Sequence, residues 1–298
     1  VTEKEIEDRI NQYKKAKKII PGNADVSIYD IMKRCALNEA DEIALKEYVE
    51  SKGMIFISTP FSRSAAERLE RMGVVAYKIG SGECNNYPLL KHISSFGKPV
   101  ILSTGMNTIE SIRKAVDVFS NANVPLALLH TTNLYPTPFH LVRYGGLKEL
   151  SSSFLNNPFG LSDHTITNHA CFGAVALGAK VVERHFTLDR TMKGGDHAAS
   201  LEPLGFKKMV RDIRHVEKAL GSYEKTMQES EKPIFKKLGK SIVSLIEMPV
   251  GTIIKKNMIT TKGPGNGISP MKFNKIIGKK TKITIKPDEV IKEADIEW

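Results

Sequence analysis

The chain contains no long apolar run. No stretch approaches the ~20 apolar residues of a membrane-spanning helix, and the N-terminus lacks the apolar segment of a signal peptide. These absences argue against a membrane or secreted protein, and we expect a cytoplasmic location. Residues 1–20 are highly charged, which indicates a helix or a tether.

Cysteine is scarce, and the three that are present are Cys35, Cys84 and Cys171. Their number is odd, they lie far apart, and none belongs to a CxxC pair. This pattern excludes a disulfide framework and the common zinc sites. We therefore expect reduced thiols, mostly buried.

Acidic residues are also in deficit, because 33 Asp and Glu face 44 Lys and Arg, for a formal charge of +11. Lysine clusters occur at residues 14–18, 232–240 and 272–286. Such charge attracts nucleic acids, acidic surfaces or small anions. The clusters hold few aromatic residues to stack on bases, and no nucleic-acid-binding motif is present. We expect no nucleic-acid partner and favour a small anionic substrate.

What the chain does contain is a series of short apolar runs separated by segments of helix length. The six runs are residues 54–61, 75–83, 100–105, 126–133, 159–164 and 180–187. Runs rich in Val, Ile and Leu that alternate with helices are typical of parallel βαβ units. Helices are predicted between and after them, at residues 42–52, 64–72, 108–120 and 204–220, with Asn107 capping the third.

This pattern predicts an α/β fold of the (β/α) barrel class. A closed barrel has eight strands and roughly 250 residues, so the first two βα units of a (β/α)8 barrel are expected to be absent from this chain. We assign the incomplete barrel to residues 1–221, a polar, lysine-rich linker to 222–238 and a small β-rich domain to 239–298.

Polar residues end each predicted strand, where barrel enzymes build their active sites. They suit an anionic substrate and a metal ion, and they are Thr59, Lys78, Ser81, Glu83, Ser103, Asn133, Ser162, His164, Glu183 and His185.

His164 and His185 end consecutive predicted strands, so their rings are expected to converge at the barrel mouth. A lone histidine is more often a structural, hydrogen-bonded residue. Two of them beside Asp163 and Glu183 favour a divalent metal that acts as a Lewis acid on a carbonyl. Glu183 shares the strand face of His185 and is expected to be a further ligand or to contact one.

Lys78 lies inside an apolar run, where an unpaired ammonium would be costly, so it needs an anionic partner. Two roles compete: a Schiff-base nucleophile, or a clamp on a carboxylate or phosphate. Hydroxyl and amide donors at Ser81 and Ser103 favour the clamp. Asn133, Tyr135 and Asp196 lie on loops at the same rim and match sugar hydroxyls.

Several long blocks together resemble the sialic acid synthase family, which condenses phosphoenolpyruvate with an N-acetylated hexose. These blocks include IPGNADVSIYDIMKRCAL, YKIGSGECNNYPL, HTTNLYPTP, GLSDHT, VALGAKVVERHFTLDRTMKGGDHAASLEP and GPGNGISP. The resemblance implies a (β/α)8 barrel followed by an antifreeze-like SAF domain. It also implies a domain-swapped homodimer, in which that domain covers the barrel of the partner.

The resemblance further implies the role of each site residue. Mn²⁺ or Mg²⁺ would bind His164 and His185, which with Lys78 form the catalytic set. Phosphoenolpyruvate would contact Thr59, Lys78, Ser81, Ser103, Asn133 and Ser162, and the sugar would contact Glu83, Tyr135 and Asp196. The chain departs from the bacterial pattern at Gly263, which stands where those members have arginine, with Lys262 adjacent.

The expected activity is that of an N-acetylneuraminate synthase, which joins phosphoenolpyruvate to N-acetylmannosamine and releases phosphate by C–O cleavage. The alternatives are a synthase of legionaminic or pseudaminic acid and, more distantly, a Schiff-base aldolase. A non-catalytic barrel whose C-terminal domain binds a carbohydrate or a protein is a further alternative.

Overall fold

The computed structural model describes residues 36–192 and 196–298, which form two compact units divided between Gly221 and Ser222. The predicted N-terminal helix or tether and Cys35 lie outside the described residues. Within the described residues, no helix has both the length and the apolar character needed to cross a membrane.

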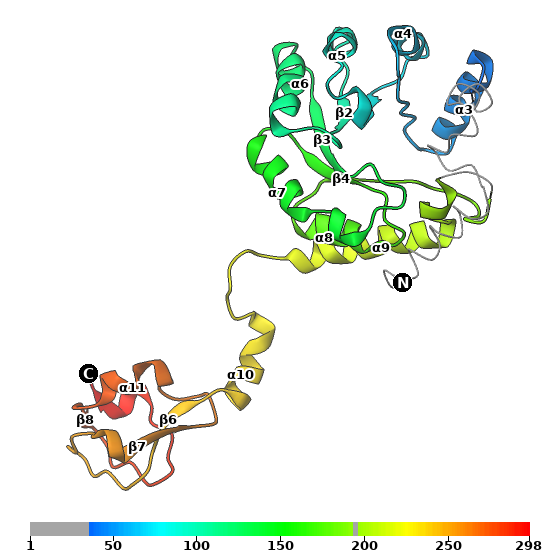
Figure 1. The fold of residues 1–298 in the computed structure, drawn as a ribbon. Helices are drawn as coiled ribbons and strands as arrows, with labels where there is room; N and C mark the ends of the chain where they lie inside the picture. Colours follow the sequence, from blue (N-terminus) through cyan, green and yellow to red (C-terminus); the bar gives the residue numbers. More distant parts are fainter. Residues whose placement is uncertain (1–35, 193–195) are drawn as a thin grey trace. The chain divides into compact units, whose positions relative to one another are not determined.

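The first unit is built on a parallel sheet of five strands in the order β1-β2-β3-β4-β5. The strands are β1 (Tyr77–Ile79), β2 (Val100–Ser103), β3 (Leu126–Thr131), β4 (Phe159–Asp163) and β5 (Val181–Arg184). All four pairings join neighbours in the chain, as repeated βα units require. Figure 1 shows helices α4 to α9 following one another around the outside of this sheet. The sheet, with the small β-rich unit that follows, confirms the predicted fold class.

One predicted strand is wrong. The run at residues 54–61 contributes only an isolated parallel bridge between Ser58 and Tyr77, with the Lys78 amide donating to the Ser58 carbonyl at 3.2 Å. Among the described residues the run pairs on one side alone, and Pro60 has no amide hydrogen to extend a ladder. Its Ile55 side chain is 70% exposed.

The helices of the first unit are α3 (Glu39–Ser51), α4 (Arg63–Arg71), α5 (Tyr87–Ser94), α6 (Ile109–Asn121), α7 (Tyr144–Ser153), α8 (His169–Ala176) and α9 (Pro203–Leu220). Four of them, α3, α4, α6 and α9, lie close to the predicted ranges, and α5, α7 and α8 had no predicted bounds. The predicted cap of α6 is off by one residue, because Thr108 accepts from the Ser111 amide. Asn107 instead donates to the carbonyls of Ser81 and Gly105.

The core of the first unit fills the space between the strands and α4, α5 and α6. Fully buried members come from both layers, among them Ile79, Leu90, Leu102 and Phe119. Each such side chain contributes about 1.5–3 kcal/mol through its removal from water. Helix α9 is less well covered, since Met209 is buried while Val210 on the predicted apolar face is 42% exposed.

The two described cysteines are free and buried, as predicted. Burial raises the pKa of the Cys84 thiol to about 12. Burial and the nearby Asp163 carboxylate raise the pKa of the Cys171 thiol as well. Both thiols therefore stay protonated near neutral pH.

A buried ion pair joins β4 to β5 on the helix-facing side of the sheet. The Arg184 guanidinium donates to the Asp163 carboxylate, and both side chains are essentially inaccessible to solvent. Arg184 also donates to the carbonyls of Thr165 at 2.7 Å and Ala199 at 3.2 Å, while Asp163 accepts from the Cys171 thiol of α8. The hydrogen bonds of Asp163 therefore hold two strands and a helix together, although its charge also acts on the neighbouring His164.

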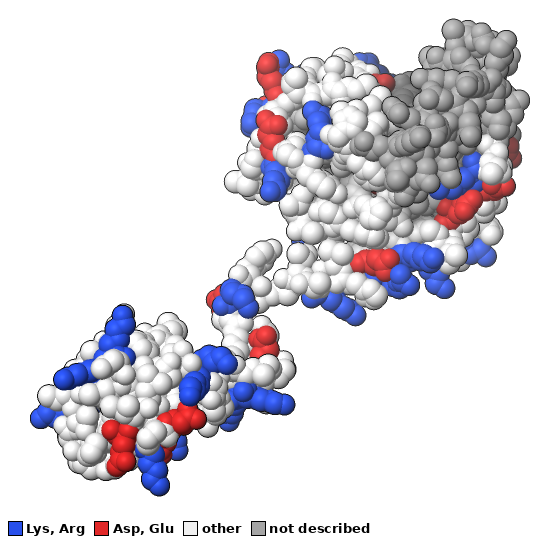
Figure 2. Space-filling model, turned by 60° about the horizontal axis from the view of Figure 1, so that its bottom comes forward, with Lys and Arg blue, Asp and Glu red and all other residues white. Residues whose placement is uncertain are grey.

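The second unit begins with α10 (Lys232–Leu238) and contains two small antiparallel sheets. Its other elements are β6 (Ser241–Ser244), β7 (Ile259–Lys262), α11 (Phe273–Ile276), β8 (Lys280–Thr281) and β9 (Ile296–Glu297). Nine buried residues, eight of them isoleucine, form a core of its own. Helix α10 was not predicted, because the segment lacks a clear apolar period. Figure 2 shows lysine side chains spread over the visible face of this unit.

We expect the change Arg184→Met to destabilise the first unit by about 3–5 kcal/mol, because it leaves the Asp163 carboxylate buried without its partner. Urea unfolding followed by circular dichroism, with hydrogen exchange at the β4 and β5 amides, measures the loss. Arg211→Met is the matched control, since Arg211 pairs with Asp212 at the surface. Equal midpoints for the two variants would contradict a role for the buried pair.

We also expect stability to fall as the pH drops below about 6.5, because His130 binds protons less readily when folded. Burial lowers the pKa of His130, although its hydrogen bond to the Val142 carbonyl opposes the shift. The stabilisation is present above the unfolded pKa and is lost toward the lower folded pKa, by at most about 1.4 kcal/mol per pH unit. Urea midpoints at several pH values should fall less steeply in His130→Gln, and an unchanged slope would refute this assignment.

Candidate active site

The carboxyl ends of the five strands carry most of the predicted site residues to one edge of the sheet. Ser81 lies in the turn after β1, Ser103 ends β2, and Asn133 follows β3. His164 and His185 directly follow β4 and β5. The parallel pairings therefore place these groups at the same end of the sheet, as the sequence predicted.

Lys78 and Glu183 form the centre of a network that joins four strands. The Lys78 ammonium donates to the Ser103 hydroxyl at 2.8 Å and lies 3.4 Å from the Glu183 carboxylate. The other oxygen of Glu183 accepts from the Ser162 hydroxyl at 2.6 Å. Because β1 and β5 stand at opposite ends of the strand order, this contact requires the sheet to curl.

The anionic partner that the sequence predicts for Lys78 is therefore Glu183. The sequence had linked Glu183 to the histidines because it shares a strand face with His185. The charge of Glu183 does act on His164, where it opposes the lowering of the pKa, while its carboxylate oxygens contact Lys78 and Ser162. Only closure of the sheet reveals this pairing, since the two residues are far apart in the chain.

Ser81, Gly105 and Asn133 form a second cluster beside the network. The Gly105 amide donates to the buried Ser81 hydroxyl at 3.1 Å. A β-carbon at Gly105 would lie 1.9 Å from the Asn133 Oδ1, so only glycine permits this close approach. That Oδ1 is buried and has no hydrogen-bond partner among the described residues. A buried polar atom left unpaired is costly, which indicates a position completed by a ligand or water.

The rings of His164, His185 and Tyr135 pack together at the same edge. Ring centroids lie 5.2 Å apart for the two histidines and 4.1 Å apart for Tyr135 and His164. The His164 Nδ1 donates to the Thr132 carbonyl at 2.8 Å, which leaves its Nε2 lone pair available. Burial lowers the pKa of His164, in spite of this hydrogen bond, and so favours the neutral ring. Thr132, which orients this ring, had no signal in the sequence.

The two histidines suit a divalent metal ion that keeps open coordination positions. Within the described residues, no group of three or more His, Cys, Asp and Glu side chains is arranged to hold a metal. The His185 Nδ1 lies 3.7 Å from the Asp196 carboxylate, which brings that predicted residue to the cluster. Burial raises the pKa of Tyr135, and the charges of Asp196 and Glu183 add to the effect.

Two predicted residues stand apart from these clusters. The Glu83 carboxylate accepts from the Asn86 side chain at 2.6 Å, at the start of α5. Thr59 lies beside Gly80, with its methyl group 3.9 Å from where a β-carbon on that glycine would be. Neither joins the hydrogen-bonded networks of the described residues.

Comparison with known proteins identifies the family of each unit. Residues 2–225 match the NeuB family, and residues 239–297 match the SAF domain. The chain is 37% identical over 250 residues to the N-acetylneuraminate-9-phosphate synthase of Homo sapiens, covering 84% of this chain and 70% of that protein. It is 39% identical over 261 residues to the N,N'-diacetyllegionaminic acid synthase of Campylobacter jejuni, covering 86% and 78%.

A solved structure shows the same similarity. The N-acetylneuraminic acid synthetase of Leptospira borgpetersenii, in complex with citrate, is 32% identical and superposes with a TM-score of 0.66, covering 69% of this chain and 72% of that one. The family match spans most of the chain, and the named relatives are synthases of sialic acid or of a related nonulosonic acid. The chain therefore belongs to the NeuB family of sialic acid and related nonulosonic acid synthases.

Proposed function

We propose that the chain condenses phosphoenolpyruvate with N-acetylmannosamine to give N-acetylneuraminate and inorganic phosphate. The observation that carries this proposal is the Lys78 network, which lies at the same strand ends as the His164 and His185 rings. An ammonium group and several hydroxyls beside two imidazoles suit an anionic enol phosphate and a carbonyl partner. Condensation requires both substrates in one pocket, held in reacting geometry.

The phosphoenolpyruvate half of the proposal uses the polar groups of the strand ends. Lys78 would exchange part of its interaction with Glu183 for the phosphate or carboxylate of the substrate. The Ser81 and Ser103 hydroxyls each accept one hydrogen bond, so their own hydrogens remain to donate to an anion. These groups act with Thr59, Asn133 and Ser162 in the proposed phosphoenolpyruvate site.

The ion pair with Glu183 favours the clamp over the Schiff-base role of Lys78. A Schiff base needs a neutral amine as nucleophile, whereas a paired ammonium holds anions. Glu183 would keep the ammonium paired until the substrate arrives. It would then remain beside the substrate with its proton-accepting oxygen already oriented by Ser162.

We further propose that His164 and His185 hold Mn²⁺ or Mg²⁺. The free Nε2 of the neutral His164 supports this role, since metal ligands of this type must be deprotonated. Such an ion, when bound, would supply Lewis acidity toward the sugar aldehyde. Thr132 fixes the His164 ring for that task through the hydrogen bond to Nδ1.

The sugar half of the site would use Tyr135, Asp196 and Glu83. Tyr135 packs against His164, and Asp196 lies next to His185, so both stand where the second substrate would meet the first. Glu83 would need to release Asn86 before it reaches a sugar hydroxyl. The choice among N-acetylated hexoses is the finer part of the proposal, because the named relatives make different products.

The first expected result is metal-dependent release of phosphate from phosphoenolpyruvate only when an N-acetylated hexose is present. EDTA should abolish it and Mn²⁺ should restore it, and His185→Ala should lose metal binding and turnover. With ¹⁸O in the bridging position of phosphoenolpyruvate, C–O cleavage places the label in the released phosphate. A panel of N-acetylmannosamine, its 6-phosphate and diacetamido hexoses identifies the substrate. Full activity in metal-free buffer would contradict the metal assignment.

Within the same assay, Lys78→Ala should raise the KM for phosphoenolpyruvate at least tenfold, about 1.4 kcal/mol. The KM for the sugar should change much less, because the clamp touches only the anion. Lys91→Ala on the surface of α5 is the matched control. Borohydride trapping of substrate on Lys78 would instead support the aldolase, and an intact catalytic profile would show a structural lysine.

We also propose that the protein is a cytoplasmic homodimer in which the second unit acts over the barrel of the partner. Exposed apolar side chains on the second unit support a partner, since Val250 is 65% and Met271 is 92% exposed.

Gly263 stands where bacterial members of the family have an arginine, which the resemblance implies would reach from the second unit to the sugar of the partner's site. Lys262 is paired with Asp288, whereas the Lys240 ammonium lies 3.8 Å from where a Gly263 β-carbon would be. Lys240 is thus the cation next to this position.

A dimer with an exchanged domain should depend on both chains. Deletion of residues 239–298 should leave a folded barrel with severely reduced activity. Mixing this deletion with a full-length His185→Ala chain gives heterodimers, in which the intact barrel of the deletion chain is covered by the second unit, or lid, of the other chain. Recovered activity would support the exchange, and a fully active monomer in sedimentation would refute it. A lid that merely binds carbohydrate would leave the deletion fully active.

A further inference from the structure

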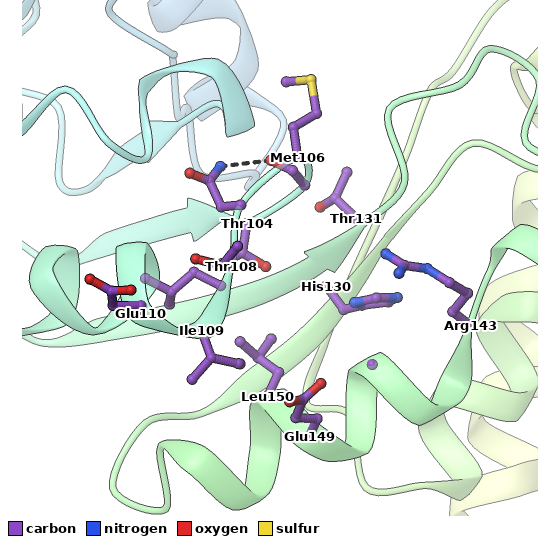
Figure 3. A pocket seen from close by; sticks show the side chains of 14 residues that line it. Thr104, Met106, Thr108, Ile109, Glu110, His130, Thr131, Arg143, Glu149 and Leu150 are labelled. Atoms are coloured by element: carbon purple, nitrogen blue, oxygen red, sulfur yellow. Dashed lines mark hydrogen bonds between the residues drawn. The ribbon is translucent and has the colours of Figure 1, made fainter.

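A cavity of about 490 Å³ lies between the first turns of α6 and α7 (Figure 3). It is formed by the loop after β2, the end of β3 and the start of α7. None of the predicted site residues lines it. Its volume is sufficient for a small organic molecule.

The cavity has one cationic side chain, the exposed guanidinium of Arg143, and two exposed carboxylates, Glu110 and Glu149. Arg143 lines it and forms no ion pair within the described part of the chain. Arg143 is also the N-terminal cap of α7, with φ +51°, and α7 has no side-chain cap there. The cavity therefore faces a guanidinium next to the positive end of a ten-residue helix.

His130 provides a second polar group, and this one is buried. Its side chain reaches the cavity wall while the residue is only 7% exposed. The Nε2 donates to the Val142 carbonyl at 2.8 Å, so the Nδ1 of the neutral ring has no partner among the described residues. Figure 3 shows the His130 ring and the Arg143 side chain on the same side of the cavity. The close fit of Gly146, whose β-carbon would lie 2.9 Å from the ring, fixes this orientation.

The remaining walls set the rest of the ligand. Ile109, Ile112 and Leu150 present apolar surface opposite the polar groups. Of the two carboxylates, Glu110 is paired with Lys114 at 3.3 Å, whereas Glu149 would oppose a strongly charged ligand. Together these walls suit a molecule with one anionic group and a small apolar body.

We propose that this cavity is a second ligand site, which binds a small organic anion through Arg143 and His130. The anionic group is a phosphate or a carboxylate, because both match a guanidinium and an oriented N-terminal helix turn. A protonated oxygen of the ligand would donate to the His130 Nδ1. The apolar part would pack on Leu150 and the first turn of α6.

This site shares a wall with the strand-end site. Gly105 and Asn107 line the cavity on one side. On the other side, Gly105 approaches Asn133 and donates to Ser81, whose carbonyl accepts from Asn107. An occupant of the cavity would therefore set the position of the groups that we assign to phosphoenolpyruvate. This regulatory consequence rests on the proposed function, whereas ligand binding itself does not.

The test uses phenyl phosphate as the ligand, with inorganic phosphate and benzoate as separate arms for the two anionic groups. Calorimetry is performed on the full-length Lys78→Ala variant, in which the strand-end site is weakened. We expect one equivalent to bind. Adding Arg143→Asn, which suits a positive φ, should weaken binding at least tenfold, and Arg143→Lys should recover part of it. Glu149→Gln should tighten binding, and Lys148→Ala on the exposed side of α7 should leave it unchanged.

Absence of binding by Lys78→Ala would overturn the proposal, and so would binding that Arg143→Asn leaves intact. A second measurement follows chemical shifts of the His130 ring, which should move on titration in Lys78→Ala and stay fixed in the Arg143→Asn combination. In the wild-type chain, phenyl phosphate should change the KM for phosphoenolpyruvate. A failed condensation assay with intact binding would overturn the proposed function and leave this site standing.

Discussion

The contact between Lys78 and Glu183 ties together the two ends of the sheet, and the remaining geometry of the strand ends depends on it. The Lys78 ammonium is largely removed from solvent, and an unpaired charge in such a position is strongly unfavourable, so it needs an anionic partner. The pair joins β5 to β1, and it also joins the two serines, because Ser103 accepts from Lys78 and Ser162 donates to Glu183. The anion requirement of one lysine thus agrees with the curl of the whole sheet.

Two polar networks run on opposite faces of the same two strands. Ser162 is in register with Glu183, and Asp163 is in register with Arg184. Because side chains alternate along a strand, the first pair faces the barrel interior and the second faces the helices. The network of Ser162 and Glu183 lies at the proposed substrate site, whereas the network of Asp163 and Arg184 joins the two strands to each other and to α8. A shift of register by one residue would exchange their surroundings, which neither pair tolerates.

Much of this arrangement follows from local pattern. The apolar runs predicted β1 to β5, and the polar ends of those runs predicted where Ser81, Ser103, Ser162 and the histidines gather. Strict alternation along β4 also predicts that the Asp163 side chain points to the opposite face from the Ser162 side chain, as the structure shows. The pairing of Lys78 with Glu183 could not be predicted, because it depends on closure of the sheet. The run at residues 54–61 failed for a related reason, since apolar character alone does not supply a second neighbour.

The segment of residues 104–108 lines the cavity between α6 and α7, and its Gly105 contacts Asn133 and Ser81 of the strand-end site on the other side. Because the same residues border both sites, a substitution in this segment changes both of them. Gly105 cannot be replaced by a larger residue, because a side chain there would collide with Asn133. Sequence changes that adapt either proposed site to another ligand are therefore expected at its rim, and not in the segment that the two sites share.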